Sequence, residues 1–195
     1  MNYFAHLVLS QPTVESTVGN LLGDFARAVD RESLPRAVAD GLDNHRAVDR
    51  FTDAHESIRS LKTRFSRRRR RFAGIALDVY FDHLLMKHWP AFDSRPLRQV
   101  IDAFYQRMMA GQFLMPGERM RTTTRRMVEQ DWFGSYVELD SVGEALDRIA
   151  ARIRFDNGFA NVIEELRHHE AELEAVFLAF FPELRRHIGE LGLES

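Results

Sequence analysis

Residues 72–86 of the chain read FAGIALDVYFDHLLM, and this stretch decides the fold. Apart from Asp78, Asp82 and the neighbouring His83, it is apolar on nearly every side of a helix. Such a helix has no face suited to water, so we expect it to be buried. It forms the main part of a predicted helix at 72–89, which stops at a proline.

Helical periodicity recurs on both sides of this stretch, and no strand alternation extends over more than a few residues. The chain of 195 residues also lacks internal repeats and low-complexity linkers. The sequence therefore predicts an all-α protein, a compact single-domain helical bundle spanning 1–195. Six further helices are expected: from Ser33 through His45 and Asp49; from near His55 through the arginine run; at 94–111; at 118–133; from Ser141, where Glu144 completes a capping box; and at 158–181, with Pro182 bending or ending it.

Composition limits the chemistry that the chain can perform. Apolar residues make up 45% and charged residues 29%, the balance of a soluble globular protein. There is no cysteine, so disulfides and thiolate chemistry are excluded, and any metal site must use His, Asp or Glu. We find no secretory signal and no stretch long enough to span a membrane, and we therefore expect a cytoplasmic protein.

Charge is unevenly distributed, although the formal net charge is only −2. No acidic residue occurs from Ser57 to Leu77, a segment that carries eight arginines and lysines. A second basic cluster lies between Arg119 and Arg126, whereas 164–174 is rich in glutamate. This asymmetry indicates a patch for an anionic partner.

Asp78 and Asp82 lie one turn apart on the predicted buried helix and share a face. Two buried carboxylates repel each other, and burying them unpaired costs several kcal/mol each. A cation must therefore face them. A metal ion fits this requirement, and so does a structural network with Arg46 or Arg50.

A second polar segment, 45–55, reads HRAVDRFTDAH. Its helix places His45 and Asp49 on one face and Arg46 and Arg50 on an adjacent face. A histidine combined with carboxylates favours Mn²⁺, Mg²⁺ or Zn²⁺ over a soft metal ion. Taken alone, this spacing is more typical of a local hydrogen-bonded pair.

The two remaining clues are weaker when taken one at a time. In GNLLGDF, at 19–25, glycines allow close backbone packing beside Asp24, which is otherwise typical of a helix cap or turn. His6 lies among apolar residues and is either a core histidine or an active-site group. Together these groups concentrate in the first half of the chain, which favours a metal centre between the early helices. The polar residues in question are His6, Asp24, His45, Asp49, Asp53, His55, Asp78, Asp82, His83 and His88.

Several of these segments, taken in order, resemble the acyl carrier protein phosphodiesterase family. They are NYFAHL at 2–7, GNLLGDF at 19–25, HRAVDRFTDAH at 45–55, AGIALDVYFDH at 73–83 and HW at 88–89. The resemblance implies a helical fold distantly related to the HD-domain phosphohydrolases. It also implies an enzyme that uses a divalent metal, Mn²⁺ or alternatively Mg²⁺, to hydrolyse holo-acyl carrier protein to apo-protein and 4'-phosphopantetheine.

The resemblance also suggests roles for individual residues. The chain has no His-Asp dipeptide of the HD type, only the reversed Asp82-His83. The expected metal ligands are Asp24, His45, Asp78 and Asp82, with His83 and His6 as further candidates. Asp49 or Asp53 is expected to orient the attacking water. Arg46 and Arg50 are expected to neutralise charge on the phosphoryl oxygens. His83 or His88 is expected to protonate the leaving serine oxygen, and His6 is a possible substrate contact.

The implied partner is a small acidic carrier protein, which requires a positive docking face. The acid-free stretch 59–71, with Arg64, Arg68 and Arg69, is predicted to supply that face, although a solvated basic surface explains each arginine equally well. Three other readings stay open: a phosphohydrolase of nucleotides or small phosphate esters, a nucleic-acid-binding module, and a structural helical protein. The nucleic-acid reading lacks a recognition motif, so no nucleic acid is expected as a partner. No membrane is expected as a partner either, because no stretch is long enough to span one. The sequence does not predict the oligomeric state.

Overall fold

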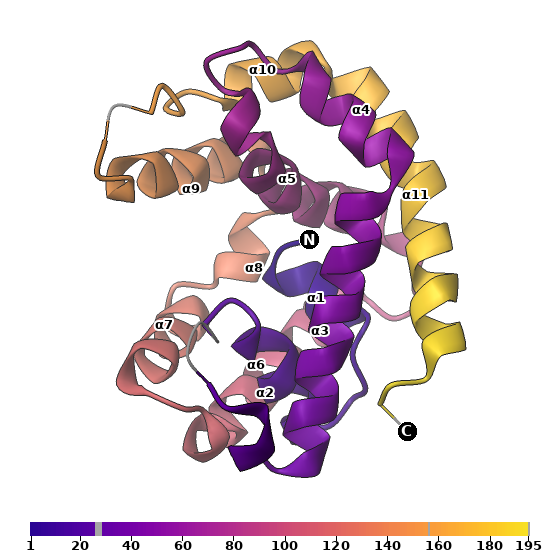
Figure 1. Cartoon of the computed structure of the whole chain (residues 1–195), viewed down its shortest axis with the longest axis vertical. Coiled ribbons are helices and arrows are strands. Elements are labelled where there is room, and N and C mark those ends of the chain that lie inside the picture. Colours follow the sequence, from indigo (N-terminus) through magenta and orange to yellow (C-terminus); the bar gives the residue numbers. More distant parts are fainter. Residues whose placement is uncertain (26–28, 156, 195) are drawn as a thin grey trace.

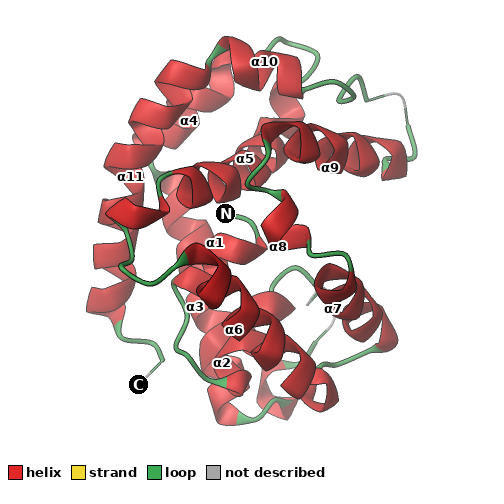
Figure 2. Cartoon of the chain, turned by 180° about the vertical axis from the view of Figure 1, so that it is seen from behind, coloured by secondary structure: helices red, strands yellow, loops and turns green. Residues whose placement is uncertain are grey.

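The computed structural model describes residues 1–25, 29–155 and 157–194, and all regular secondary structure in these ranges is helical (Figure 2). The predicted all-α class is therefore confirmed. The α-helices are α1 Tyr3–Val8, α2 Val14–Leu22, α3 Arg36–Ala54, α4 Glu56–Arg64, α5 Ala73–Lys87, α6 Leu97–Ala110, α7 Glu118–Glu129, α8 Trp132–Ser135, α9 Leu139–Arg152, α10 Ile163–His168 and α11 Glu170–Leu191. Four 3₁₀ turns accompany them: η1 Arg31–Ser33, η2 Arg70–Phe72, η3 Trp89–Ala91 and η4 Gln112–Leu114.

Helix α5 is the buried centre of the fold, as its sequence predicted. Eleven of its 15 residues are buried, and α1, α9, α10 and α11 all pack against it. Figure 1 shows α3, α4 and α11 along one side of the molecule and α7, α8 and α9 along the other. One hydrophobic core joins these layers and is rich in aromatic rings; Phe4, for example, packs edge-on against Phe104 and Phe133.

Helix α1 is too short to be stable alone and depends on α5. Its N-cap residue, Asn2, makes no side-chain capping bond. Instead, Asp82 of α5 accepts hydrogen bonds from the backbone N–H groups of Phe4 (3.0 Å) and Ala5 (2.9 Å). A fully buried carboxylate thus satisfies two free donors at the positive end of the α1 dipole. This contact fixes α1, and with it the next residue, His6.

Helices α2 and α3 pack with their backbones in close contact. A Cβ atom on Gly19 would lie 2.3 Å from the carbonyl oxygen of Val38 and 2.8 Å from the Cα of Gly41, so no larger residue fits there. The predicted close packing at the glycines of 19–25 is therefore confirmed. It brings the carbonyl of Asn20 within hydrogen-bonding distance of His45 on α3.

The arginine run does not lie on a helix, contrary to the sequence prediction. Helix α4 ends at Arg64, because Phe65 turns to an extended conformation and buries its ring in the core. The arginines follow in a turn and in η2, where Arg69 donates hydrogen bonds to the carbonyls of Gly158 and Ala160 and pairs with Glu165. Tertiary partners therefore override the local helical pattern in this segment.

Two predicted helix boundaries in the second half of the chain are also wrong. The helix expected at 118–133 breaks at Asp131, which adopts a left-handed conformation (φ 46°) between α7 and α8. Helix α9 starts at Leu139, so Ser141 lies inside its first turn and does not cap it.

The helix expected at 158–181 is divided into α10 and α11, and α11 continues through Pro182 to Leu191. Pro182 removes one backbone donor, whose acceptor would be the carbonyl of Leu178. Leu178 is exposed, so water can satisfy that carbonyl and the helix continues. Among the described helices, none is both long enough and apolar enough to cross a membrane.

We predict that Asp82→Ala strongly destabilises the fold, because it leaves two buried N–H groups of α1 without an acceptor. Each such group costs about 1–3 kcal/mol, so the free energy of unfolding should fall by roughly 2–6 kcal/mol. Urea denaturation measures this change. Asp102→Ala is the matched control: Asp102 pairs with Arg98 at the surface (2.8 Å), and its loss should cost less than about 1 kcal/mol. Equal losses in the two variants would show that Asp82 does not anchor α1.

Candidate metal centre

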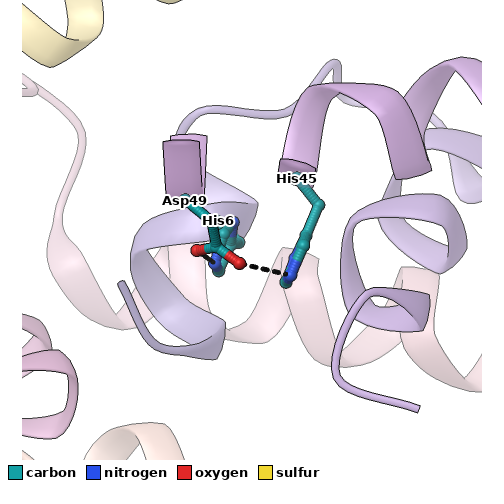
Figure 3. A group of neighbouring side chains, drawn as sticks. All are labelled: His6, His45 and Asp49. Atoms are coloured by element: carbon teal, nitrogen blue, oxygen red, sulfur yellow. Dashed lines mark ion pairs between the residues drawn. The ribbon is translucent and has the colours of Figure 1, made fainter. Parts of the chain in front are cut away.

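His6, His45 and Asp49 gather at the point where α1 meets α3 (Figure 3). His45 and Asp49 lie one turn apart on α3, and His6 faces them from α1. Each residue offers one potential ligand atom, and these atoms all lie within 4.8 Å of one another. Among the described residues, no other group of three or more His, Asp or Glu side chains is arranged in this way.

The orientation of His45 is fixed by a hydrogen bond from behind. Its Nδ1 lies 2.7 Å from the carbonyl oxygen of Asn20, which can only accept, so Nδ1 carries the proton. The lone pair of Nε2 then points at Asp49 Oδ2, 3.1 Å away. Two acceptors at this distance repel each other unless a proton or a metal ion lies between them. A backbone carbonyl that holds the far nitrogen of an imidazole is a common feature of histidine metal ligands.

The second imidazole packs directly on the first. The rings of His6 and His45 are stacked with centroids 3.8 Å apart, and Nε2 of His6 lies 3.3 Å from Asp49 Oδ1. The same nitrogen lies 3.1 Å from the carbonyl oxygen of Met1, and the buried Nδ1 has no partner. Burial lowers the pKa of His6 to about 3. His6 is therefore neutral at physiological pH, and a metal ion would have to displace the proton that its Nε2 shares with the carbonyl of Met1.

Asp49 provides the negative charge and the opening to solvent. Burial alone would raise its pKa, but the close approach of His45, His6 and the amino group of Met1 outweighs burial and holds the pKa well below the usual range for aspartate. Asp49 is therefore ionised, and 43% of its side chain is exposed. Two imidazoles and one carboxylate, open on one side, suit a divalent cation that prefers nitrogen and oxygen ligands.

Three further charged groups lie close to this cluster: the amino group of Met1, Asp78 and Asp24. The amino group of Met1 lies 2.9 Å from Asp78 Oδ1 and 3.6 Å from Asp49 Oδ1. Burial opposes the charge of this amino group, but Asp78 and Asp49 outweigh that effect and raise its pKa to about 10. Asp24 keeps part of its surface open, yet desolvation and the charges of Asp49 and Asp78 raise its pKa to about 6.

Only one of the four expected ligands, His45, belongs to the compact cluster. Asp24 and Asp78 act on the cluster through their charge, whereas both oxygens of Asp82 accept backbone hydrogen bonds from α1. The arginines proposed to neutralise the acidic pair are not its partners, because backbone N–H groups bind Asp82 and an amino group binds Asp78. Metal binding by Asp24, Asp78 and Asp82 stays a prediction.

The residues expected to assist catalysis lie at several places around the cluster. Asp53 is 73% exposed and pairs with Lys62, and Arg46 pairs with Asp43. Arg50 is exposed on α3, one residue beyond Asp49. His83 is buried, with Nδ1 2.9 Å from the carbonyl oxygen of Tyr136, and His88 pairs with Glu174. The structure brings none of these groups into the cluster of three, and their catalytic roles stay predictions.

The arginines expected to dock a partner are engaged mainly within the protein. Arg64 pairs with Glu172 on α11, and Arg69 pairs with Glu165 on α10. The Arg68 side chain packs so closely on Gly158 that a Cβ there would lie 1.9 Å from Nε. These contacts tie the loop after α4 to the C-terminal helices, and a docking role for this segment stays a prediction.

Sequence reasoning missed two groups that shape the centre. The carbonyl of Asn20 fixes His45, but a backbone acceptor leaves no signature in the sequence. The glycines on either side of it were the only hint, and Gly23 indeed packs directly against the His45 ring. The amino group of Met1, which meets Asp78, has no sequence signal at all.

Comparison with known proteins gives a consistent result. The family model described as "Acyl carrier protein phosphodiesterase" matches residues 1–184. Curated proteins of that name are similar to the chain at 31% identity over 187 residues in Shigella boydii serotype 18, 29% over 185 in Pectobacterium atrosepticum and 30% over 184 in Serratia proteamaculans. Each alignment covers 94% of this chain and 95% of the relative. No solved structure matches the chain, so the expected likeness to HD-domain enzymes stays a prediction.

We predict that Gly23→Ala disrupts the centre without unfolding the protein. The added Cβ would lie 2.0 Å from Cδ2 of His45, and the ring cannot retreat freely because His6 is stacked on it. Displacing the imidazole should weaken Mn²⁺ binding by about 10- to 100-fold, as measured by calorimetry. Gly189→Ala is the control, since nothing lies within 4 Å of its added methyl group. Unchanged Mn²⁺ affinity in Gly23→Ala would remove His45 from the metal centre.

Proposed function

The chain belongs to the acyl carrier protein phosphodiesterase family, and we propose on that basis that it hydrolyses holo-acyl carrier protein to apo-protein and 4'-phosphopantetheine. The centre formed by His6, His45 and Asp49 carries out this reaction with a divalent metal ion, Mn²⁺ or alternatively Mg²⁺. The observation that carries the proposal is the contact between Nε2 of His45 and Oδ2 of Asp49, in which two acceptors face each other at 3.1 Å.

The donor set supports the choice of metal. Neutral imidazoles and an ionised carboxylate suit an ion of borderline or hard character, and the absence of cysteine removes the ligands that soft metals prefer. His6 and His45 would supply nitrogen ligands, and Asp49 would supply oxygen. The bound ion would supply Lewis acidity toward water and toward the phosphoryl oxygens.

The residues around the cluster account for the rest of the reaction. An oxygen of water forms a bond to phosphorus while the bond between phosphorus and the serine oxygen breaks. The electron pair of that bond leaves with the serine oxygen, which takes up a proton, and the attacking water loses one. Asp49 is exposed and ionised, so it can orient the water. Arg50, which follows Asp49 on α3, can stabilise charge on the phosphoryl oxygens.

The proposed substrate determines which partner and which cell compartment we expect for the protein. An acyl carrier protein is the partner, and the cytoplasm, where carrier proteins are used, is the compartment. Neither a nucleic acid nor a membrane takes part in this reaction.

The test is the mass of purified holo-acyl carrier protein after incubation with this protein and Mn²⁺. We expect a loss equal to one phosphopantetheine, and we expect a chelator to prevent it. No loss with a folded, Mn²⁺-bound protein would contradict the proposal and favour the alternative, a phosphohydrolase of nucleotides or small phosphate esters.

Asp49→Asn links this reaction to the centre, because the amide keeps the shape of the side chain but loses its charge. The rate of phosphopantetheine release should fall by at least about 100-fold. Asp40→Asn provides the matched control on the same helix, since Asp40 forms ion pairs with Arg31 and Arg36 outside the cluster. A near-normal rate in Asp49→Asn would place the chemistry elsewhere.

A further inference from the structure

A cavity of about 230 Å³ lies between the start of the chain and the helices α7, α8 and α9. Asp24 forms part of its wall together with Tyr3 from α1. The second half of the chain closes the other side and contributes three arginines and the ring of Trp132, with Tyr136 beside them. The arginines are Arg119 of α7 and Arg148 and Arg152 of α9, and Trp132 belongs to α8.

The three arginines converge on this cavity without sufficient negative charge to balance them. Arg148 and Arg152 lie one turn apart on α9, and Arg119 faces them from α7. Among the described residues, neither Arg119 nor Arg152 forms an ion pair, and Arg148 meets only the exposed Glu144 at 3.5 Å. Like charges gathered in this way favour an anionic ligand.

Asp24 links the cavity wall to the metal centre. The residue before it, Gly23, contacts the ring of His45, and the charges of Asp49 and Asp78 act on the Asp24 carboxylate. A ligand in the cavity would therefore lie between the metal centre at one end and the arginines at the other. A phosphate group suits this position, because the metal and the guanidinium groups both bind its oxygens.

We propose that this cavity binds the 4'-phosphopantetheine arm of the substrate, an inference that rests on the proposed function. Cleavage of the serine–phosphate bond leaves the phosphate on the arm, so the enzyme must hold the arm next to the metal centre. The carrier protein is far too large for the cavity and stays outside. The cavity is slightly smaller than the range of roughly 300–1,000 Å³ typical of ligand pockets, so it encloses the phosphate and the adjoining part of the arm.

The walls also match the arm beyond the phosphate. The carbon skeleton next to the phosphate carries two methyl groups, which require apolar contacts. Val79 of α5 and Ala145 and Ile149 of α9 provide an apolar wall beside the arginines. Phosphate recognition and a neighbouring apolar wall occur together in this cavity, and acidic side chains of a carrier protein would use only the arginines.

Calorimetry with the full chain in Mn²⁺ tests the proposal, with 4'-phosphopantetheine and pantetheine as the two probes. Wild-type protein should bind 4'-phosphopantetheine at least about tenfold more tightly than pantetheine, because only the former engages the guanidinium groups. The variant Arg148→Ala/Arg152→Ala, and independently Arg119→Ala, should raise the Kd for 4'-phosphopantetheine at least about tenfold. The Kd for pantetheine should stay nearly unchanged.

The matched control is Arg125→Ala/Arg126→Ala, which removes two exposed charges from α7 outside the cavity and should leave both Kd values unchanged. Equal binding of the two probes, or an unchanged Kd in the cavity variants, would overturn the inference. A raised KM for holo-carrier protein with unchanged probe binding would also overturn it and assign the arginines to the carrier surface. If wild-type protein cleaves holo-carrier protein in such a case, the proposed function stands while this inference fails. If probe binding depends on the arginines but holo-carrier protein is not cleaved, this inference stands while the proposed function fails.

Discussion

The arrangement of the centre depends on one buried carboxylate. Asp82 lies on the central helix α5 and accepts hydrogen bonds from the N–H groups of Phe4 and Ala5 in α1. It thereby holds in place a six-residue helix whose N-cap residue makes no side-chain hydrogen bond. His6 follows immediately on that helix and stacks on His45. A small shift of α1 would separate the two imidazoles, so the electrostatic anchor inside the core determines whether three candidate ligands from two distant segments can meet. The full burial of Asp82 keeps water from competing for these hydrogen bonds.

A second constraint acts from the side of α2. Gly19 lets α2 approach α3, and Gly23 lets the following turn lie against the ring of His45. The same approach presents the carbonyl of Asn20 to Nδ1 of His45 and fixes its tautomer. The centre is therefore held from two directions, by a carboxylate behind α1 and by a backbone carbonyl behind α3. Asp49 alone remains substantially exposed, which directs the reactive side toward solvent and toward the neighbouring Asp24.

Some of this arrangement could be predicted from the sequence, and the limits have physical causes. The largely apolar character of 72–86 predicted the burial of α5, and helical spacing placed His45 and Asp49 together, since both properties are local. The partner of Asp82 was not predictable, because a carboxylate in the core can bind a metal, an arginine or a helix terminus with the same sequence pattern. The arginine run has helical character, but Glu165 and the carbonyls near Gly158 hold it in a turn. The cavity walls of α7 and α9 lie far from the centre in the sequence, and only the fold brings their arginines beside Asp24.

The most direct test of this account is the position of the metal in a crystal grown with Mn²⁺, located from anomalous scattering. We expect a strong peak within bonding distance of Nε2 of His45 and a carboxylate oxygen of Asp49, with His6 beside it. Both oxygens of Asp82 should still accept the N–H groups of Phe4 and Ala5. A peak bound by Asp82 instead, or no peak among His6, His45 and Asp49, would contradict the assignment of the centre.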